Sequence, residues 1–453
     1  MLAPLSLLAA LPIASVWAAP MCSLKPSVSA ALAASATGVS GAASGSSSSS
    51  SSSGSNSSSV ADEVVASTWY AGWHGEDFPP ENLSWSKYTQ VTYAFAVTTP
   101  DVNTVSLADS DEALLPRFVN AAHQNNVKAM LTVGGWTGSQ YFSSAVATDA
   151  NRTAFVKTVL GLVSKYNLDG LDFDWEYPNK QGIGCNLISA DDSQNFLSFL
   201  QALRADPAGK NLTLSAAVGI TPFAGPDGTP MTDVSDFAKV LDYVAIMNYD
   251  VWGSWSSSVG PNAPLNDTCA SAADQQGSAV SAVKAWTAAG FPANQLVLGV
   301  ASYGHSFSVP NSAALSGNTL QAYPAFDKGS QPLGDKWDTD APAGVDQCGN
   351  PAGGPSGIFD FFGLIDGKFL TANGTVADGI DYRFDECSQT PYVYNPSTQV
   401  MVSYDDAKSF AAKGKFINDA GLLGFAMWEA AGDSNDILLD AIEEAIGMEE
   451  VDC

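Results

Sequence analysis

The stretch Asp169-Gly170-Leu171-Asp172-Phe173-Asp174-Trp175-Glu176-Tyr177-Pro178 decides how the rest of the chain is interpreted. Within it, Gly170–Trp175 alternates large apolar residues with acidic ones, which is typical of a β-strand. Because the side chains of a strand alternate between two faces, Asp172, Asp174 and Glu176 project to one side. The apolar residues between them project to the other side, where helices would cover them.

Three carboxylates on one face of a buried strand are costly unless they share protons. Crowding of like charges should raise at least one of their pKa values and keep one carboxyl protonated near neutral pH. Glu176 comes last and would lie at the C-terminal mouth of a barrel, where barrel enzymes carry out their chemistry. A protonated carboxyl there is a general acid. A solvated acidic edge is the plainer alternative, but the intervening large apolar residues argue against it.

Apolar, β-branched runs alternate with helical patterns along the chain from about residue 62. The predicted strands are Val64–Tyr70, Val91–Val97, Ala129–Val133, Gly170–Trp175, Leu212–Val218, Tyr243–Met247, Leu296–Ser302 and Leu422–Trp428. The predicted helices are Asp111–Gln124, Ala150–Tyr166, Ala190–Arg204, Val234–Leu241, Ala272–Ala289, Asp405–Asn418 and Ile437–Ile446. This order predicts an α/β fold, a parallel (β/α)8 TIM barrel. A doubly wound open sheet competes, but no Gly-rich dinucleotide turn follows the first strand.

About 100 residues between the seventh strand and the helix at Asp405 break this rhythm. They are rich in Gly and Pro and contain the strand-like pieces Gly357–Phe362 and Pro391–Tyr394. A structureless loop of that length would argue against the assignment. We therefore expect a small α+β insertion between strands 7 and 8, over the active-site face. The expected boundaries are 61–305 and 401–448 for the barrel and 306–400 for the insertion.

The N-terminal segment predicts secretion. Residues 1–18 are typical of a signal peptide, since an apolar run precedes the small-residue cleavage pattern Val16-Trp17-Ala18. An N-terminal anchor is the alternative, but the run is too short to span a bilayer. Residues 19–60 form a Ser-rich tail or linker that we expect to be disordered, and that is compatible with retention in a cell wall. Sequons for N-glycosylation occur at Asn56, Asn82, Asn151, Asn211, Asn266 and Asn373.

The charge balance excludes several classes of partner. The chain has 19 Lys and Arg against 47 Asp and Glu, a net charge of −28. Nucleic acids and anionic membranes both require a basic surface, so neither is an expected partner. Later segments lack the roughly 18 consecutive apolar residues of a membrane span. We expect a monomer whose partner is its substrate.

An oxidising compartment would allow cysteines to form disulfides. We expect Cys185 to pair with Cys269 and Cys348 with Cys387, although connectivity does not follow from sequence. Cys22 and Cys453 would stay free or pair with each other. A metal site is the alternative use of these residues. The chain has no CxxC motif and its three His residues are scattered, so we expect neither a metal nor any other cofactor.

The acidic motif resembles the DxxDxDxE signature of glycoside hydrolase family 18, the chitinases. The resemblance extends from about Val64 to Ile446. Thr132-x-Gly134-Gly135 resembles the family's SxGG motif, with Thr in place of Ser, and Met247-x-Tyr249-Asp250 its MxYD motif. Phe425-x-Met427-Trp428-Glu429 resembles its closing Trp segment. Tyr303-Gly304-His305-Ser306-Phe307 lies where many members have YGRxF, so His305 departs from the common Arg.

This resemblance implies a substrate-assisted retaining mechanism. Glu176 would protonate the glycosidic oxygen, and the 2-acetamido oxygen of the substrate would attack the anomeric carbon. Asp174 would hold the acetamido N–H, and Asp172 would adjust the protonation of Asp174. Tyr249 would donate a hydrogen bond to the acetamido oxygen, and Asp250 would bind the distorted sugar.

The resemblance also implies a set of substrate-binding residues. Trp428 would form the floor under the −1 sugar, and Met247 and Gly135 would lie beside it. Tyr70 and Phe95 would line the same site, although core packing is the plainer role for both. Trp136 and Trp252 are candidates for stacking on sugar faces. Asp169, Thr132 and Gly134 are expected to serve as structural parts of their motifs.

Three functions compete with a secreted chitinase that cleaves β-1,4-linked N-acetylglucosamine polymers. An endo-β-N-acetylglucosaminidase shares the acidic signature, but the insertion and the MxYD motif favour a chitinase. A chitinase-like lectin binds without cleaving, but such proteins usually lose the terminal Glu or a supporting Asp, and here Asp172, Asp174, Glu176 and Tyr249 are intact. A structural cell-wall protein would not explain the acidic strand.

Overall fold

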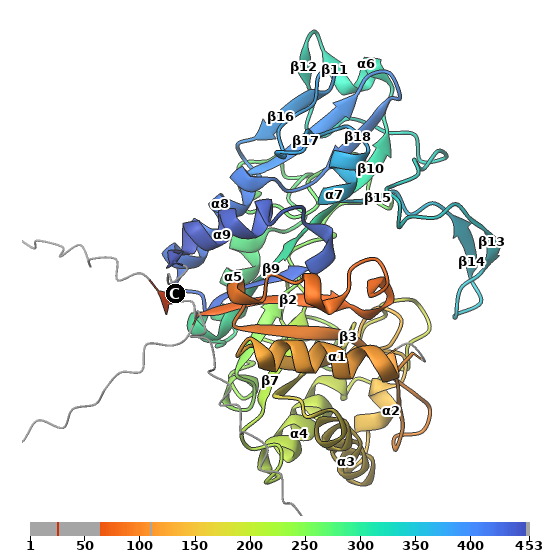
Figure 1. Ribbon diagram of the computed structural model, residues 1–453. Helices are drawn as coiled ribbons and strands as arrows, with labels where there is room; N and C mark the ends of the chain where they lie inside the picture. Colours follow the sequence, from red (N-terminus) through yellow and green to blue (C-terminus); the bar gives the residue numbers. More distant parts are fainter. Residues whose placement is uncertain (1–24, 27–63, 109–110, 450–453) are drawn as a thin grey trace, which may run out of the picture.

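The computed structural model describes residues 25–26, 64–108 and 111–449 (Figure 1). The predicted signal peptide, most of the Ser-rich segment, and Cys22 and Cys453 lie outside these residues. Two short strands, β1 (Lys25–Pro26) and β20 (Met448–Glu449), pair antiparallel near the ends of the chain. Among the described residues, no helix has both the length and the apolar character needed to cross a bilayer.

Eight parallel strands close into a barrel, which confirms the predicted (β/α)8 fold. The sheet runs in the order β2-β19-β9-β8-β7-β6-β5-β3, and β2 pairs with β3 to close it. The strands are β2 (Val65–Ala71), β3 (Gln90–Thr98), β5 (Lys128–Gly134), β6 (Gly170–Asp174), β7 (Thr213–Val218), β8 (Tyr243–Ile246), β9 (Leu296–Ala301) and β19 (Gly424–Trp428). A short strand β4 (Val105–Ser106) pairs antiparallel with the end of β3.

Helices cover the outside of this barrel, and most begin and end where the sequence predicts. They are α1 (Asp111–Gln124), α2 (Phe142–Val146), α3 (Asp149–Tyr166), α4 (Asp192–Ala205), α5 (Ala279–Ala288), α8 (Ala407–Ala420) and α9 (Ile437–Ile446).

Two helix predictions are wrong. Val234–Leu241 is not an α-helix: it contains a single 3-10 turn at Phe237–Lys239, which still buries Val234, Phe237 and Leu241. The helix predicted from Ala272 begins only at Ala279, since Ser278 forms a capping box with Ser281 at that point.

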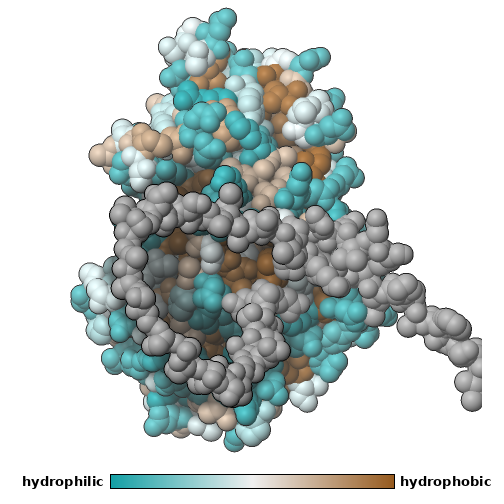
Figure 2. All heavy atoms as spheres, turned by 90° about the vertical axis from the view of Figure 1, so that its left-hand side faces the viewer, coloured by the Kyte–Doolittle hydropathy of each residue, from teal (hydrophilic) through white to brown (hydrophobic). Residues whose placement is uncertain are grey.

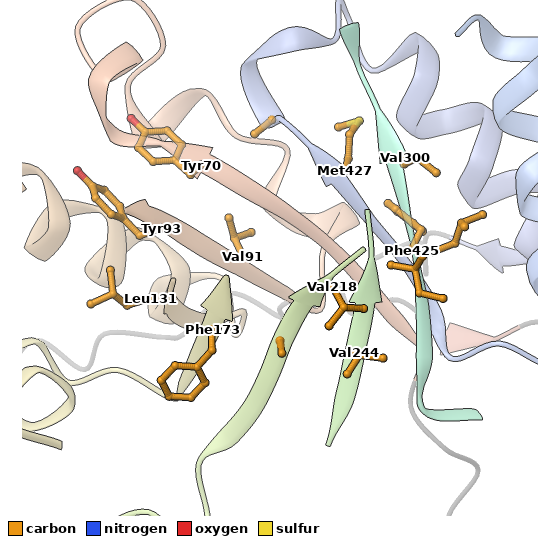
Figure 3. Packing of buried hydrophobic residues seen from close by; sticks show 14 of the residues in the cluster. Tyr70, Val91, Tyr93, Leu131, Phe173, Val218, Val244, Val300, Phe425 and Met427 are labelled. Carbon is orange, nitrogen blue, oxygen red and sulfur yellow. The ribbon is translucent and has the colours of Figure 1, made fainter. Parts of the chain in front are cut away.

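The alternation of each strand separates two apolar layers. Outward-facing residues of the strands pack under the helices, and Figure 3 shows this layer at Val91, Leu131, Phe173, Val244 and Phe425. Inward-facing residues fill the barrel itself with Val65, Trp69, Ala94, Ala217, Tyr243, Ala245, Val297 and Ala426. The strand β6 therefore places its apolar residues under helices and its carboxylates inside the barrel, as the sequence predicts.

The long interval after β9 contains a five-stranded antiparallel sheet, which lies at the top of Figure 1. Its order is β15 (Ile358–Asp360), β10 (Tyr303–Ser308), β18 (Val400–Ser403), β17 (Thr390–Asn395) and β16 (Asp381–Asp385). The interval also contains α6 (Asn311–Ala314), α7 (Phe361–Asp366) and the hairpins β11 (Leu315–Ser316) with β12 (Thr319–Leu320) and β13 (Ala341–Val345) with β14 (Pro351–Gly354). A separate small core, with Phe307, Tyr392, Tyr394 and Met401, packs against this sheet.

The disulfide connectivity differs from the prediction. Cys185 bonds to Cys348, with 5.4 Å between their Cα atoms, and Cys269 bonds to Cys387, with 5.7 Å. The predicted pairs joined neighbours in sequence. Each observed disulfide instead joins a loop of the barrel to the inserted sheet region, because the insertion folds back over the loops that follow β6 and β8.

Hydrophilic residues cover much of the face of the barrel and of the inserted sheet that Figure 2 shows, with smaller apolar patches between them.

Candidate active site

Asp172 lies inside the barrel, where its neighbours on both adjacent strands are polar. Thr132 and Ser215 occupy the same level of β5 and β7. The Thr132 hydroxyl donates to Asp172 Oδ2 at 2.8 Å, and the Ser215 hydroxyl donates to Oδ1 at 2.7 Å. The Trp69 indole donates a third hydrogen bond at 3.3 Å. Burial raises the pKa of Asp172, while these hydrogen bonds act to lower it.

Asp174 lies one level higher and has no such support. Its neighbours at the same level are Gly134 and Ala217, which carry no polar side chain. Asp174 Oδ1 is buried without a hydrogen-bond partner among the described residues. Burial, followed by the charges of Glu176 and Asp172, raises its pKa well above the usual range. Asp174 therefore combines a raised pKa with a buried carboxyl oxygen that is available to bind a ligand.

Glu176 lies at the mouth of the barrel, just beyond the end of β6. Its backbone is fixed, because its N–H donates to Ser139 Oγ at 3.0 Å and its carbonyl accepts from Asn186 Nδ2 at 2.7 Å. The pKa of its carboxyl is raised to about 7, chiefly by burial; a hydrogen bond with Tyr177 opposes this rise, and the charge of Asp250 adds to it. A carboxylic acid with this pKa is able to act as a general acid near neutral pH.

Asp250 faces Glu176 across the mouth and is held by two side chains. Its Oδ1 accepts a hydrogen bond from the Tyr303 hydroxyl at 2.8 Å and lies 2.7 Å from His305 Nε2. Burial acts to raise the pKa of Asp250, but the contacts with His305 and Tyr303 outweigh it and lower that pKa. Asp250 is therefore a carboxylate, and His305 occupies the position beside it where the resemblance predicts Arg.

Tyr249 and Met247 follow β8 and line the same cleft. Burial, and then the negative charge of Asp174, raises the pKa of Tyr249 well above its usual range, so that its hydroxyl stays a hydrogen-bond donor. Its ring contacts Tyr303 edge to face at 6.0 Å. Met247 packs partly buried against the residues that fill the barrel.

An aromatic floor lies at the end of β19. The ring of Trp428 stacks on Phe95 at 5.5 Å and contacts Trp69 edge to face at 5.9 Å. Phe95 therefore supports Trp428 from below, and its contact with a sugar stays a prediction. Gly135 lies against this floor, because a Cβ there would be 2.9 Å from the Phe95 ring, and its N–H donates to Asp174 O at 2.8 Å.

Three exposed tryptophans stand along the cleft. Trp136 is 49% exposed, as expected of a sugar-stacking residue, and lines the cleft with Trp73, at 56%, and Trp255, at 60%. The sequence analysis missed Trp73 and Trp255. The available signal was their position, since each follows a strand end or motif residue by a few positions in a Gly-rich loop.

Two of the predicted binding residues do not reach the cleft. Tyr70 projects outward from β2, and its ring stacks on Phe118 of α1 at 5.4 Å. Trp252 is 2% exposed because it packs against Gly260 and near Tyr323. Both are core residues, so the sugar contacts expected of them are wrong.

The structural residues of the motifs have clear roles. Asp169 lies before β6, where its Oδ2 accepts from the Ala129 N–H at 2.8 Å and lies 2.8 Å from His123 Nε2. Gly134 has φ +116°, and a Cβ there would be 2.1 Å from Asp174 O. Only glycine allows β5 to approach β6 so closely.

The sequence analysis also missed a further buried acid in the cleft. Glu429 follows Trp428, and its Oε2 accepts a hydrogen bond from the Ala71 N–H at 3.2 Å. Burial raises its pKa to about 8. Nearby, Asp335 accepts from the Asp360 N–H at 2.6 Å, and burial raises the pKa of Asp360 well above the usual range.

The cleft has two connected parts that share Glu176, Tyr177 and Asp250. The larger, about 1020 Å³, contains the three exposed tryptophans, Trp428 and Glu429. The smaller, about 350 Å³, contains Met247 and Tyr249. Within the described ranges, no group of three or more His, Cys, Asp or Glu is placed to hold a metal ion.

A cleft with exposed tryptophans and buried carboxyls suits a sugar substrate, and the sequence comparison agrees. Residues 66–433 match the family described as glycosyl hydrolases family 18. The chain belongs to this family. This family 18 hydrolase is therefore a glycoside hydrolase, and the match includes the β6 region with Asp172, Asp174 and Glu176.

Its relatives include fungal and bacterial proteins. It is 55% identical over 393 residues, 86% of this chain and 94% of the relative, to a protein named chitinase-like effector from Moniliophthora roreri. It is 33% identical over 335 residues to Chitinase A1 from Niallia circulans, over 70% of this chain and 42% of that protein. A crystal structure of a chitinase from Rhizomucor miehei matches with a TM-score of 0.75 and 33% identity, covering 84% of this chain and 99% of the other.

Proposed function

We propose that this family 18 hydrolase is a secreted chitinase that cleaves β-1,4 bonds between N-acetylglucosamine units with retention of configuration. The observation that carries the proposal is the arrangement at β6, where Asp174, with an unpartnered buried Oδ1, lies between the hydrogen-bonded Asp172 and Glu176 in the cleft. Two disulfides support secretion, because such bonds persist in oxidising compartments.

In the proposed mechanism, Glu176 gives its proton to the glycosidic oxygen of the departing sugar. The 2-acetamido oxygen of the −1 sugar attacks the anomeric carbon, so no enzyme carboxylate acts as the nucleophile. Asp174 binds the acetamido N–H with its unpartnered oxygen and stabilises the positive charge that develops there. Asp172, held by three hydrogen bonds, keeps its own position and sets the charge felt by Asp174.

The residues around this centre position the sugar. Tyr249 donates its hydroxyl to the acetamido oxygen and directs the attack. The Trp428 ring supports the apolar face of the −1 sugar, while Asp250 accepts hydrogen bonds from its hydroxyls. Water then opens the oxazolinium intermediate from the face that the leaving group vacated, with Glu176 as the base. Two inversions give retention.

The time course of products from chitohexaose tests this function, with chromatography that resolves anomers. We expect freshly formed β-anomer, with disaccharide as a main early product. Fresh α-anomer would contradict the retaining mechanism. Cleavage restricted to N-glycan cores would favour an endo-β-N-acetylglucosaminidase instead.

A chitooligosaccharide-binding protein that does not cleave is the second candidate. The name of the Moniliophthora relatives, chitinase-like effector, favours it, since 55% identity extends over most of both chains. The intact acid Glu176 favours hydrolysis. In the chitohexaose experiment, bound but uncleaved sugar would decide for this second function.

The role of Glu176 as the general acid gives a prediction for the pH dependence of the rate. Glu176 must be protonated to act, so kcat/KM should fall as the pH rises above about 7. The negative charge of Asp250 helps to raise this pKa, after burial. In Asp250→Asn, the fall should therefore begin at a lower pH, whatever the loss in absolute rate. The control Glu112→Gln, which removes an exposed charge on α1, should leave the pH profile unchanged. If the fall of kcat/KM in Asp250→Asn began at the same pH as in the native protein, this would contradict the assignment of Glu176 as the titrating acid.

A further inference from the structure

The β13–β14 hairpin stands away from the inserted sheet and packs on little else (Figure 1). Val345, near its tip, is 71% exposed, and most residues of both strands are exposed as well. A hairpin without a buried face is not held in place by hydrophobic packing. Its position must therefore be set by contacts at its two ends.

The two ends of the hairpin, which we call its feet, lie at one side of the cleft. Asp338 joins them, because its carboxylate accepts hydrogen bonds from the N–H groups of Gly334, Ser356 and Gly357, each at 2.8 Å. Thr339 and Ser356, on either side of the hairpin, line the larger part of the cleft. The hairpin therefore begins and ends at the edge of the larger part of the cleft, on the side of the inserted sheet.

The tip is fastened to the loops that follow β5 and β6. Cys348 at the tip is bonded to Cys185 in the loop after β6. Next to it, Gln347 Nε2 donates to Thr137 O at 2.8 Å, one residue beyond the exposed Trp136 of the cleft. Gln140 links the loops after β5 and β6, since its Nε2 donates to Cys185 Sγ at 3.2 Å.

Trp136 lines the same part of the cleft as Thr339 and Ser356, and the hairpin runs from the latter two residues to the loops that follow β5 and β6. About seven extended residues at about 3.3 Å each span roughly 23 Å, enough to cross a groove that holds one polysaccharide chain. We infer that the β13–β14 hairpin is a strap, fastened covalently by Cys185–Cys348, which restricts this enzyme to chain ends and short oligosaccharides. The inference rests on the proposed function, which it narrows to a substrate class.

The physical reason is topological. An open groove accepts the middle of a long chain from the side, whereas a bridged groove accepts only an end that threads beneath the bridge. Breaking the Cys185–Cys348 bond leaves the hairpin held by its feet and by hydrogen bonds at its tip. The middle of a chain then has access to Trp136 and Glu176.

The test compares the double variant Cys185→Ser/Cys348→Ser with the native protein on soluble glycol chitin. We expect the loss of viscosity per new reducing end to increase several-fold, while hydrolysis of chitotetraose stays comparable. Cys269→Ser/Cys387→Ser removes the other disulfide and should leave this ratio unchanged. If the first variant fails to fold, residues 342–352 are replaced by Gly-Gly together with Cys185→Ser, with the same expected increase. An unchanged ratio in a folded strap variant would overturn the inference.

A binding measurement separates this inference from the proposed function. In the Glu176→Gln background, the number of protein molecules bound per glycol chitin chain should not depend on chain length while the strap is fastened. Without the strap, that number should increase in proportion to chain length. If the native protein cleaves nothing, the proposed function fails and this measurement still tests the strap. Length-dependent binding with the strap intact would contradict it.

Discussion

Glu176→Gln should abolish hydrolysis of chitohexaose while oligosaccharide binding remains. Gln has nearly the same shape as a protonated Glu and keeps a hydrogen-bond donor, but it has no acidic proton to give. The loss of a general acid costs roughly 10²- to 10⁴-fold in rate. The loss should lie at the upper end of this range, because the leaving sugar alkoxide is a strong base that must be protonated as it departs.

Single-turnover rates and calorimetric titration with chitohexaose measure the two effects separately. The dissociation constant should change little, because the tryptophans and Asp250, which supply most sugar contacts, are untouched. Glu112→Gln, on the solvent side of α1, serves as the control for a neutralised acid and should keep full activity. Substantial turnover in Glu176→Gln would mean that another group is the acid.

The second large effect concerns the substrate. A fully deacetylated polymer should not be cleaved at all, since the acetamido oxygen of the −1 sugar is the proposed nucleophile. Weak binding would not explain the loss. The chain carries a net charge of −28, and a deacetylated polymer is cationic, so that electrostatic attraction favours the encounter.

Polymers with graded acetylation measure this dependence. The initial rate should decrease as the acetylated fraction of the polymer decreases. Every new reducing end should carry an acetyl group, as mass spectrometry of the products would show. Chitin-derived polymer with full acetylation is the matched control. Efficient cleavage of the fully deacetylated polymer would overturn the mechanism, because it would require an enzyme nucleophile.

The predicted strands agree with the structure because the apolar or alternating pattern of each strand lies within its own short stretch of sequence. The alternating run around Asp172 and Glu176 favours a strand whose apolar face is buried. The glycine pair Gly134-Gly135 then permits β5 to approach β6 closely. The helix predictions failed at Val234 and Ala272, where spacing alone was used and a capping residue, Ser278, decided the start. Capping depends on a hydrogen bond that periodicity does not reveal.

Residues in loops were predicted less well than residues in strands. Trp252 and Trp255 lie three positions apart in one loop, yet the first is buried against Gly260 and the second is 60% exposed. The residue type and the local sequence do not distinguish the buried Trp from the exposed one. Glu429 was missed as a cleft acid for the same reason, since its burial comes from segments distant in the sequence.

By itself, the sequence determined the barrel, the common face of Asp172, Asp174 and Glu176, and the position of Glu176 at the strand end. These features follow from a period of two residues and from chain order, which are local properties. Tertiary structure alone decided which carboxyl has hydrogen-bond partners and that Cys185 bonds to Cys348, 163 residues away. Those outcomes depend on which side chains meet across the strands and across the cleft, and proximity of that kind arises only when the whole chain has folded.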